Sequence, residues 1–159
     1  MVTISNNNLT ESNVVYTIGY EGIVIDTFIQ ELNKSGIKQV IDVRRNPISR
    51  KRGFSKNKLM ERLLSVGISY IHIPELGIPS SMRKNLQFKE DYIQLLNEYE
   101  TKLLPDAQLQ KEILIELLQS KPSALLCFEA DPEYCHRSRL ANVIVNETGF
   151  RQIHLHYAN

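Results

Sequence analysis

Short apolar segments that alternate with amphipathic ones constrain the fold of this chain more than any other feature. The apolar segments are rich in β-branched and aromatic residues, as strands are, and span residues 14–20, 39–43, 68–73, 123–128 and 152–157. The amphipathic segments repeat apolar residues at three- and four-residue steps, as helices do, and span residues 27–34, 56–65, 88–104, 107–119 and 137–147. Because strands alternating with helices favour a parallel sheet covered on both faces, we predict a three-layer α/β/α fold with a mostly parallel sheet of about five strands.

The chain of 159 residues is long enough for one domain with a substantial core. We predict a flexible N-terminal tail over residues 1–13 and a single α/β domain over residues 14–159. Asp26 and Ser55 are expected to cap the first two helices, because short polar side chains satisfy the free N–H groups of a first turn. Pro105 is expected to break or restart the helical pattern around it.

Composition indicates an ordinary globular protein, with 42% hydrophobic and 23% charged residues. No segment approaches the roughly 20 apolar residues of a membrane span, and the polar N-terminus lacks the apolar run of a secretory signal. We therefore expect a cytoplasmic protein without a membrane partner, whose two cysteines form no structural disulfide. The formal net charge of +1 indicates no particular partner.

Basic residues gather in one predicted loop and in the helix that follows it. Residues 44–62 contain eight Lys and Arg but a single acid, Glu61. Arg44 and Arg45 directly follow a predicted buried strand, and ligands bind at the carboxyl ends of strands in such sheets. Asp42 can hold one guanidinium in a fixed fork. The predicted anion-binding residues, with phosphate as the favoured group, are Asp42, Arg44, Arg45, Pro47, Ser49, Arg50, Phe54, Tyr20 and Arg137.

Two interpretations of this basic segment stay open. A run of like charges is often only a solvated surface without a ligand. Phe54, which stands among the cations, can stack on a base or can simply anchor the loop.

The sequence Cys135-His136-Arg137 stands where the fourth predicted strand feeds the last helix. A thiol at a helix N-terminus with His136 and Arg137 beside it is expected to have a lowered pKa and to act as a nucleophile. Glu129 is expected to act as a general base or to orient His136 or Arg137, and its alternative role is a salt bridge to Arg137 or Arg139. The predicted catalytic residues are therefore Cys135, His136 and Glu129. Only one residue separates Cys135 from Arg137, which departs from the loops in which five residues separate a catalytic cysteine from its arginine.

The same turn also has a purely structural interpretation. His136 and Arg137 can lock the turn through bonds to backbone carbonyls while Cys135 is packed, since cysteine is among the residues most often buried. Cys127 is expected to be a small buried apolar residue. A zinc site formed by the two cysteines and His136 lacks a fourth ligand at a recognisable spacing, so the sequence assigns no metal and names no cofactor.

Several short motifs follow one another along the chain. They are Tyr16-Thr17-Ile18-Gly19-Tyr20, Asp42-Val43-Arg44 with Pro47-Ile48-Ser49, Gly53-Phe54-Ser55-Lys56, Tyr70 with Leu76-Gly77, and Leu126-Cys127-Phe128-Glu129 followed by Cys135-His136-Arg137. In this order, and across most of residues 14–158, the chain resembles the family known only as domain of unknown function 488. Ile78 stands where that family usually has a second glycine. The resemblance implies a compact α/β domain with a site between the Asp-x-Arg loop and the Cys-His-Arg turn, and it implies no established reaction.

Two classes of function fit these observations. The chain can be an enzyme that binds an anionic or phosphorylated substrate at the basic loop and uses Cys135. It can equally be a non-catalytic module that binds a nucleotide or nucleic acid, in which case binding weakens steeply with salt. Both classes predict an anionic partner at the basic loop beside the Cys-His-Arg turn.

Overall fold

A computed structural model describes residues 13–157, so the predicted tail lies outside the described residues except for Asn13. The described residues form one sheet of five strands in the order β3-β2-β4-β1-β5, and every adjacent pair is parallel. The strands are β1 Val14–Gly19, β2 Gln39–Asp42, β3 Ser69–His72, β4 Ser123–Cys127 and β5 Arg151–His154. This confirms the predicted α/β fold, with a sheet that is parallel throughout.

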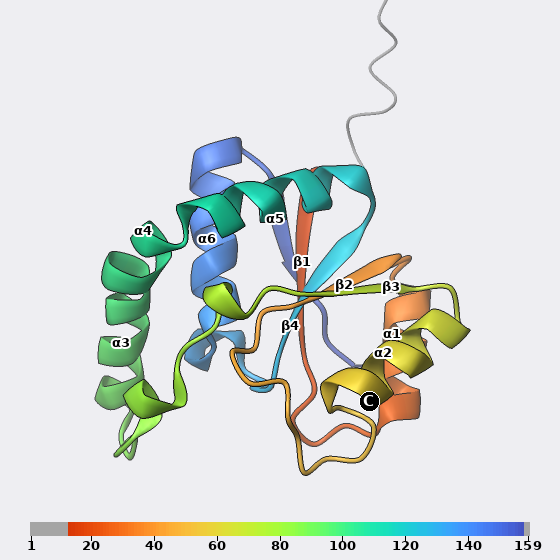
Figure 1. Cartoon of the computed structure of the whole chain (residues 1–159), viewed down its shortest axis with the longest axis horizontal. Helices are drawn as coiled ribbons and strands as arrows, with labels where there is room; N and C mark the ends of the chain where they lie inside the picture. Colours follow the sequence, from red (N-terminus) through yellow and green to blue (C-terminus); the bar gives the residue numbers. More distant parts are fainter. Residues whose placement is uncertain (1–12, 158–159) are drawn as a thin grey trace, which may run out of the picture.

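Helices cover both faces of the sheet, as Figure 1 shows. One face is covered by α1 Ile25–Lys34 and α2 Lys56–Ser65. The other is covered by α5 Gln108–Ser120 and α6 His136–Thr148. The helix α3 Lys89–Glu98 packs into the same core from its outer edge, and the short α4 Leu104–Asp106 lies between α3 and α5. Short 3₁₀ turns complete the connections: η2 Pro74–Leu76, η3 Ser80–Arg83 and η5 Pro132–Tyr134. Within the described residues, no helix combines the length and the apolar character needed to cross a membrane.

Consecutive residues of a strand pack into the two hydrophobic cores alternately, one on each face of the sheet. On β2, Val40 packs with α1 and α2, whereas the next residue, Ile41, packs with α3, α5 and α6. On β4, Leu126 and Leu125 divide in the same way. Because successive side chains of a strand point to opposite faces, a continuous apolar run supplies both cores of a doubly covered sheet.

Three local expectations differ from the structure. Ser55 does stand at the N-cap position of α2, but its hydroxyl bonds to the Ser49 backbone and makes no cap hydrogen bond to the helix. Asp26 does not cap α1, because the helix begins one residue earlier, at Ile25, and Asp26 lies in its first turn. The predicted helix 88–104 ends as an α-helix at Glu98 and continues as one π-helical segment, η4 Tyr99–Leu103. Pro105 follows after Leu104, in the first turn of α4, where the missing N–H of a proline is tolerated, so the proline restarts the helix as expected.

The chain reverses direction across the sheet between β1 and β4, which are neighbours. From β1 the chain runs to α1 on one face, and from β4 it runs to α6 on the other. Gly19 and Cys127, the last residues of the two strands, are paired in register. A crevice forms outside the carboxyl ends of strands at such a reversal, and this is where open α/β sheets bind ligands.

Two glycines allow backbones to approach closely at this edge. A Cβ on Gly19 would lie 2.0 Å from the carbonyl oxygen of Glu129, and one on Gly77 would lie 2.3 Å from the backbone nitrogen of Arg45. No real side chain can come that close to another atom, so only glycine fits at either position. The turn after β4 packs directly against the backbone of Gly19, and the loop after β2 packs against that of Gly77.

We expect Gly19→Ala to destabilise the protein by about 3 kcal/mol, because the turn after β4 must move to admit the methyl group. Gly67→Ala is the matched control: its φ is +79° and nothing lies within 4 Å of the added Cβ, so only the left-handed backbone cost of about 1 kcal/mol applies. Urea denaturation of both variants measures the difference. Equal losses of stability would contradict the close packing at Gly19.

Candidate functional site

A pocket of about 320 Å³ opens at the carboxyl edge of the sheet. It lies between the loop after β2, the turn after β4 and the segment that contains η3. Four arginines and no acidic residue line it. The lining residues are Tyr20, Arg44, Arg45, Asn46, Ile48, Ser49, Arg50, Ile78, Ser80, Arg83, Cys127 and Phe128.

Asp42 and Arg44 form a buried bidentate pair at the end of β2. Arg44 donates from Nε to Asp42 Oδ1 at 2.9 Å and from Nη2 to Oδ2 at 2.7 Å. Asp42 is fully buried, and Tyr70 also donates its hydroxyl to it at 2.5 Å. Burial alone would lower the pKa of Arg44, but the bonds to Asp42 and its charge outweigh that effect and raise it. The guanidinium is therefore permanently charged and fixed in place, as the sequence predicted for this pair.

The remaining nitrogen of Arg44 ties the basic loop to β1. Its Nη1 donates to the Tyr20 hydroxyl at 2.9 Å and to the Phe54 carbonyl at 2.7 Å. Tyr20 and Phe54 stack with their ring centroids 4.3 Å apart, and Phe28 packs edge-on against Phe54. Phe54 is fully buried, so of its two proposed roles the structure shows the anchor.

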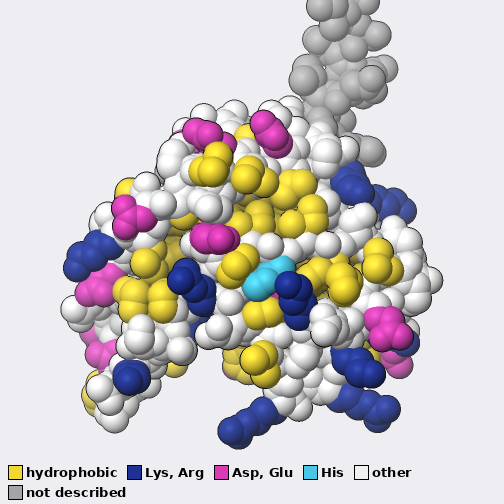
Figure 2. Space-filling view, in the orientation of Figure 1, with side chains coloured by type: hydrophobic (Ala, Val, Ile, Leu, Met, Phe, Trp, Pro, Cys, Tyr) yellow, Lys and Arg dark blue, Asp and Glu magenta, His cyan; other side chains and the backbone are white. Residues whose placement is uncertain are grey.

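Arg45 and Arg50 are the exposed cations of the pocket. Neither forms an ion pair with any described residue, in contrast to Arg44 and to Arg83. Figure 2 shows Lys and Arg side chains projecting along the lower edge of the molecule, over the loop that follows β2 in Figure 1. Ser49 lies between these two arginines along the chain and also lines the pocket.

The predicted basic segment does not form one continuous surface. Arg62 pairs with Asp26 at 2.6 Å on the exposed surface. Arg52 and Lys58 line a separate hollow, which contains Asp26 and Glu61. Pro47 does not line the anion pocket, and its carbonyl accepts a hydrogen bond from the Lys56 backbone at the start of α2.

Two residues of the pocket lining, Cys127 and Arg83, are linked through Glu129, which does not itself line the pocket. The Cys127 thiol donates to Glu129 Oε2 at 3.1 Å, and Arg83 Nη1 donates to Glu129 Oε1 at 3.2 Å. Burial would raise the pKa of Glu129, but the charge of Arg83 and the bond from Cys127 outweigh that effect and lower it. The ion-pair partner of Glu129 is therefore Arg83, whereas Arg139, the alternative partner considered from sequence, pairs with Glu100.

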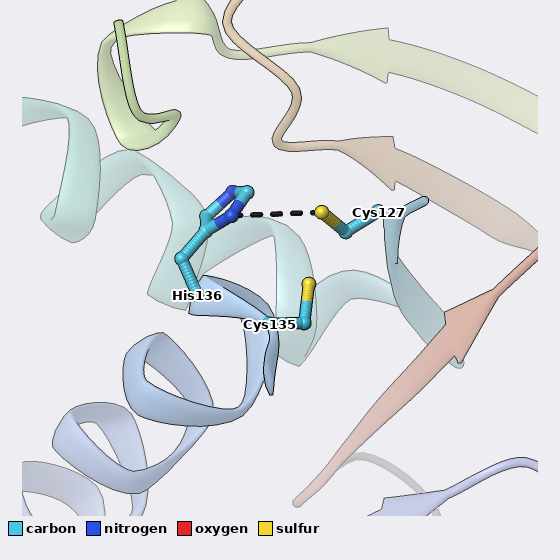
Figure 3. A group of neighbouring side chains, drawn as sticks. All are labelled: Cys127, Cys135 and His136. Atoms are coloured by element: carbon cyan, nitrogen blue, oxygen red, sulfur yellow. Dashed lines mark hydrogen bonds between the residues drawn. The ribbon is translucent and has the colours of Figure 1, made fainter. Parts of the chain in front are cut away.

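His136 has a defined orientation in the structure (Figure 3). Its Nε2 lies 2.8 Å from the Val43 carbonyl oxygen, and its Nδ1 lies 3.5 Å from Cys127 Sγ. The ring of Tyr99 packs against the imidazole edge-to-face, with centroids 5.3 Å apart. His136 is thus held between three elements and is buried.

The expectation of a lowered pKa for Cys135 is wrong. Cys135 does precede the first residue of α6, but its side chain is fully buried, and burial raises its pKa well above the ordinary thiol value. A helix dipole contributes up to about 2 kcal/mol in a buried position, or about one and a half pKa units, whereas full burial shifts a pKa by up to about 3–5 units. Cys135 does not line the pocket, and the thiol that does is Cys127.

Arg137 also lies outside the pocket lining. Its guanidinium is buried and donates to the carbonyl oxygens of Glu129 and Ala130, which closes the turn after β4. Among the described residues, its Nε is the buried side-chain nitrogen that has no hydrogen-bond partner. The structure therefore shows the backbone contacts of the turn-locking interpretation for His136 and Arg137.

Sequence reasoning did not assign Arg83, Ser80 and Ile78 to the site. They come from the irregular segment between β3 and α3, where no periodicity points to a function. Cys127 was assigned to the core because its neighbours are apolar, although its position at the last residue of β4 was a usable signal.

We expect Arg44→Met to destabilise the protein by about 3–5 kcal/mol, because it leaves the buried Asp42 carboxylate without its partner. The control is Arg62→Met, which removes an exposed ion pair with Asp26 and should cost at most about 1 kcal/mol. Urea denaturation of both variants tests the comparison. A loss of stability no larger for Arg44→Met than for the control would show that the pair is not structural.

We expect Cys135 to be unreactive toward alkylating reagents at neutral pH in a Cys127→Ala background, because burial raises its pKa and excludes the reagent. Alkylation should become fast only at alkaline pH or after denaturation. Mass spectrometry of samples quenched between pH 6 and about 10 measures this rate. Rapid alkylation of the folded chain at neutral pH would restore Cys135 as a candidate nucleophile.

Comparison with known proteins adds a family but no function. No curated protein and no solved structure matches the chain. The family model described as "Domain of unknown function DUF488" matches residues 24–144. This match runs from the segment before α1 into α6, so it contains Asp42, Arg44, Cys127, Glu129 and the Cys-His-Arg turn. Since the match covers more than half of the 159 residues, the chain belongs to the DUF488 family of domains of unknown function.

Proposed function

We propose that this protein binds a small molecule with a phosphate or comparable anionic group in the pocket at the carboxyl edge of the sheet. The observation that carries the proposal is that four arginines and no acid line this pocket. Arginine is the side chain best suited to bidentate contacts with phosphate.

The four arginines have different tasks in this proposal. Arg44 forms an ion pair with Asp42, and Arg83 forms one with Glu129. These two arginines therefore shape the pocket and add positive potential to it, but do not contact the anion directly. Arg45 and Arg50 have no acidic partner among the described residues and supply the direct contacts to the anion. Ser49 adds a hydroxyl donor between them.

The pocket also suits an apolar part of the ligand. Phe128 and Ile48 line it and are 42% and 83% exposed, respectively. A volume of about 320 Å³ is at the lower end of the range for small-molecule sites. A ligand that joins a phosphate to a flat apolar group, as a nucleotide does, matches both features.

Binding of extended nucleic acid is the alternative, and the burial of the aromatic residues argues against it. Single-stranded nucleic acid is held by exposed aromatic side chains on which successive bases stack. Phe54 is fully buried and Tyr20 is 3% exposed, so Phe128 is the exposed ring at this pocket, and a single ring cannot stack a run of successive bases. A covalent step through Cys135 is not part of the proposal either, because its thiol does not line the pocket.

We also propose the cytoplasm as the location. Its support is that both cysteines are free thiols rather than a disulfide, which suits a reducing compartment.

We expect Arg45→Gln and Arg50→Gln each to weaken binding of the preferred anion about 10- to 100-fold, since a hydrogen bond to a charged group contributes about 1.5–3 kcal/mol. The probes are inorganic phosphate, pyrophosphate and nucleoside mono- and diphosphates, measured by titration calorimetry. Arg52→Gln is the matched control, because Arg52 belongs to the same loop but lines a different hollow.

The salt dependence of binding separates the two ligand classes. A small ligand held by two arginines should give a shallow dependence, whereas nucleic acid that spans many phosphates gives a steep one. Tight, steeply salt-dependent binding of oligonucleotides, equally weakened by Arg52→Gln, would overturn the small-molecule proposal. So would a failure of every phosphorylated probe to bind.

A further inference from the structure

Two thiols and an imidazole converge at the end of β4. Cys127 is the last residue of that strand, and Cys135 and His136 stand at the start of α6. Their ligand atoms all lie within 4.8 Å of one another, and all three residues are buried. Figure 3 shows both sulfur atoms and the His136 ring bordering the same small space.

The spacing within this group matches that of ligands around one metal ion. Tetrahedral zinc has Zn–S bonds of about 2.3 Å and Zn–N bonds of about 2.0–2.1 Å, which places a sulfur and a nitrogen ligand about 3.6 Å apart. Cys127 Sγ and His136 Nδ1 lie 3.5 Å apart. These two atoms therefore already have the separation that a shared ion requires.

The tautomer of His136 also suits metal binding. The Val43 carbonyl oxygen, 2.8 Å from Nε2, can only accept a hydrogen bond, so Nε2 carries the hydrogen. In the neutral ring the lone pair is then at Nδ1, which faces Cys127. A metal-binding histidine is usually held in this way, with its other nitrogen donating to a carbonyl or carboxylate.

We propose that Cys127, Cys135 and His136 bind one divalent transition-metal ion of the zinc type, with a fourth coordination position open toward the anion pocket. Two thiolates neutralise the charge of the ion, so the buried site carries no uncompensated charge. The fourth position faces the pocket because Cys127 lines that pocket, whereas Cys135 and His136 do not. Three protein ligands with an open position are typical of catalytic rather than structural zinc.

Glu129 stands beside this group as an outer carboxylate. Its Oε2 lies 3.1 Å from Cys127 Sγ, while its Oε1 is held by Arg83. The proposal does not depend on the proposed anion binding, since no arginine is a ligand of the ion.

The test uses the full-length chain, stripped with a chelator under reducing conditions and reloaded with Zn²⁺ or Co²⁺. We expect about one ion per chain by elemental analysis. Bound Co²⁺ should give a thiolate-to-cobalt charge-transfer band and the intense visible bands of tetrahedral cobalt, and Zn²⁺ should displace it. Cys127, the thiol that lines the pocket, should be alkylated more slowly in the loaded protein than in the stripped one. Absence of stoichiometric metal, or a cobalt spectrum without a thiolate band, would overturn the proposal.

Variants identify the ligands. Cys127→Ser, Cys135→Ser and His136→Gln should each weaken metal binding by more than the roughly 10- to 100-fold loss caused by changes around a metal site. His156→Gln is the control, because His156 is an exposed histidine outside the group and should leave binding unchanged. If a ligand variant does not fold, the cobalt spectrum of the unmodified chain still decides the question. Equal losses in the control and the ligand variants would contradict the assignment.

One further variant separates this proposal from the proposed function. Arg50→Gln should weaken anion binding and leave the metal content unchanged, because Arg50 lines the pocket and is no ligand. Loss of metal in Arg50→Gln would show that the two sites are not distinct as described.

Discussion

The buried pair of Asp42 and Arg44 is the interaction on which the geometry of this edge of the sheet depends. Asp42 ends β2, receives two guanidinium bonds from Arg44 and also receives the Tyr70 hydroxyl from β3. Arg44 also donates hydrogen bonds to the Tyr20 hydroxyl, after β1, and to the Phe54 carbonyl oxygen in the basic loop. A rigid planar guanidinium can hold several acceptors at once, and one ion pair therefore fixes elements that are distant in sequence.

That arrangement determines which arginines are available to a ligand. Arg44 has its donors in use, whereas Arg45, the next residue, is exposed and has its backbone close to that of Gly77. The close approach at Gly77 keeps the segment after β3 against the loop after β2, and this brings Arg83 over the end of β4. Consequently two of the pocket arginines, Arg44 and Arg83, are held by acids, whereas the two exposed ones, Arg45 and Arg50, form no ion pair with a described residue.

The fold could be predicted from the sequence because each strand is a short apolar run and each helix an amphipathic one. The pairing of Asp42 with Arg44 was also predictable, since Asp42 ends a buried strand and Arg44 comes two residues later. Contacts across long sequence separations were not: nothing local indicates that Arg83 meets Glu129, or that His136 reaches the Val43 carbonyl. For Cys135 the position at the helix start was predicted correctly, but its burial, which decides the pKa, is a tertiary property.

The charges around Cys127 and Cys135 explain why these thiols form no ion pair with the nearby Arg83, which pairs with Glu129. Glu129 is already ionised and held by Arg83, so it places a negative charge beside Cys127. Ionising Cys127 and Cys135 as well would gather three negative charges in a buried space, which is costly without a cation. The divalent ion proposed for this group would supply that cation, and binding it as thiolates would release protons. Hence the two groups differ in charge: the arginine pocket attracts anions at all times, whereas the proposed ion together with its two thiolates carries no net charge.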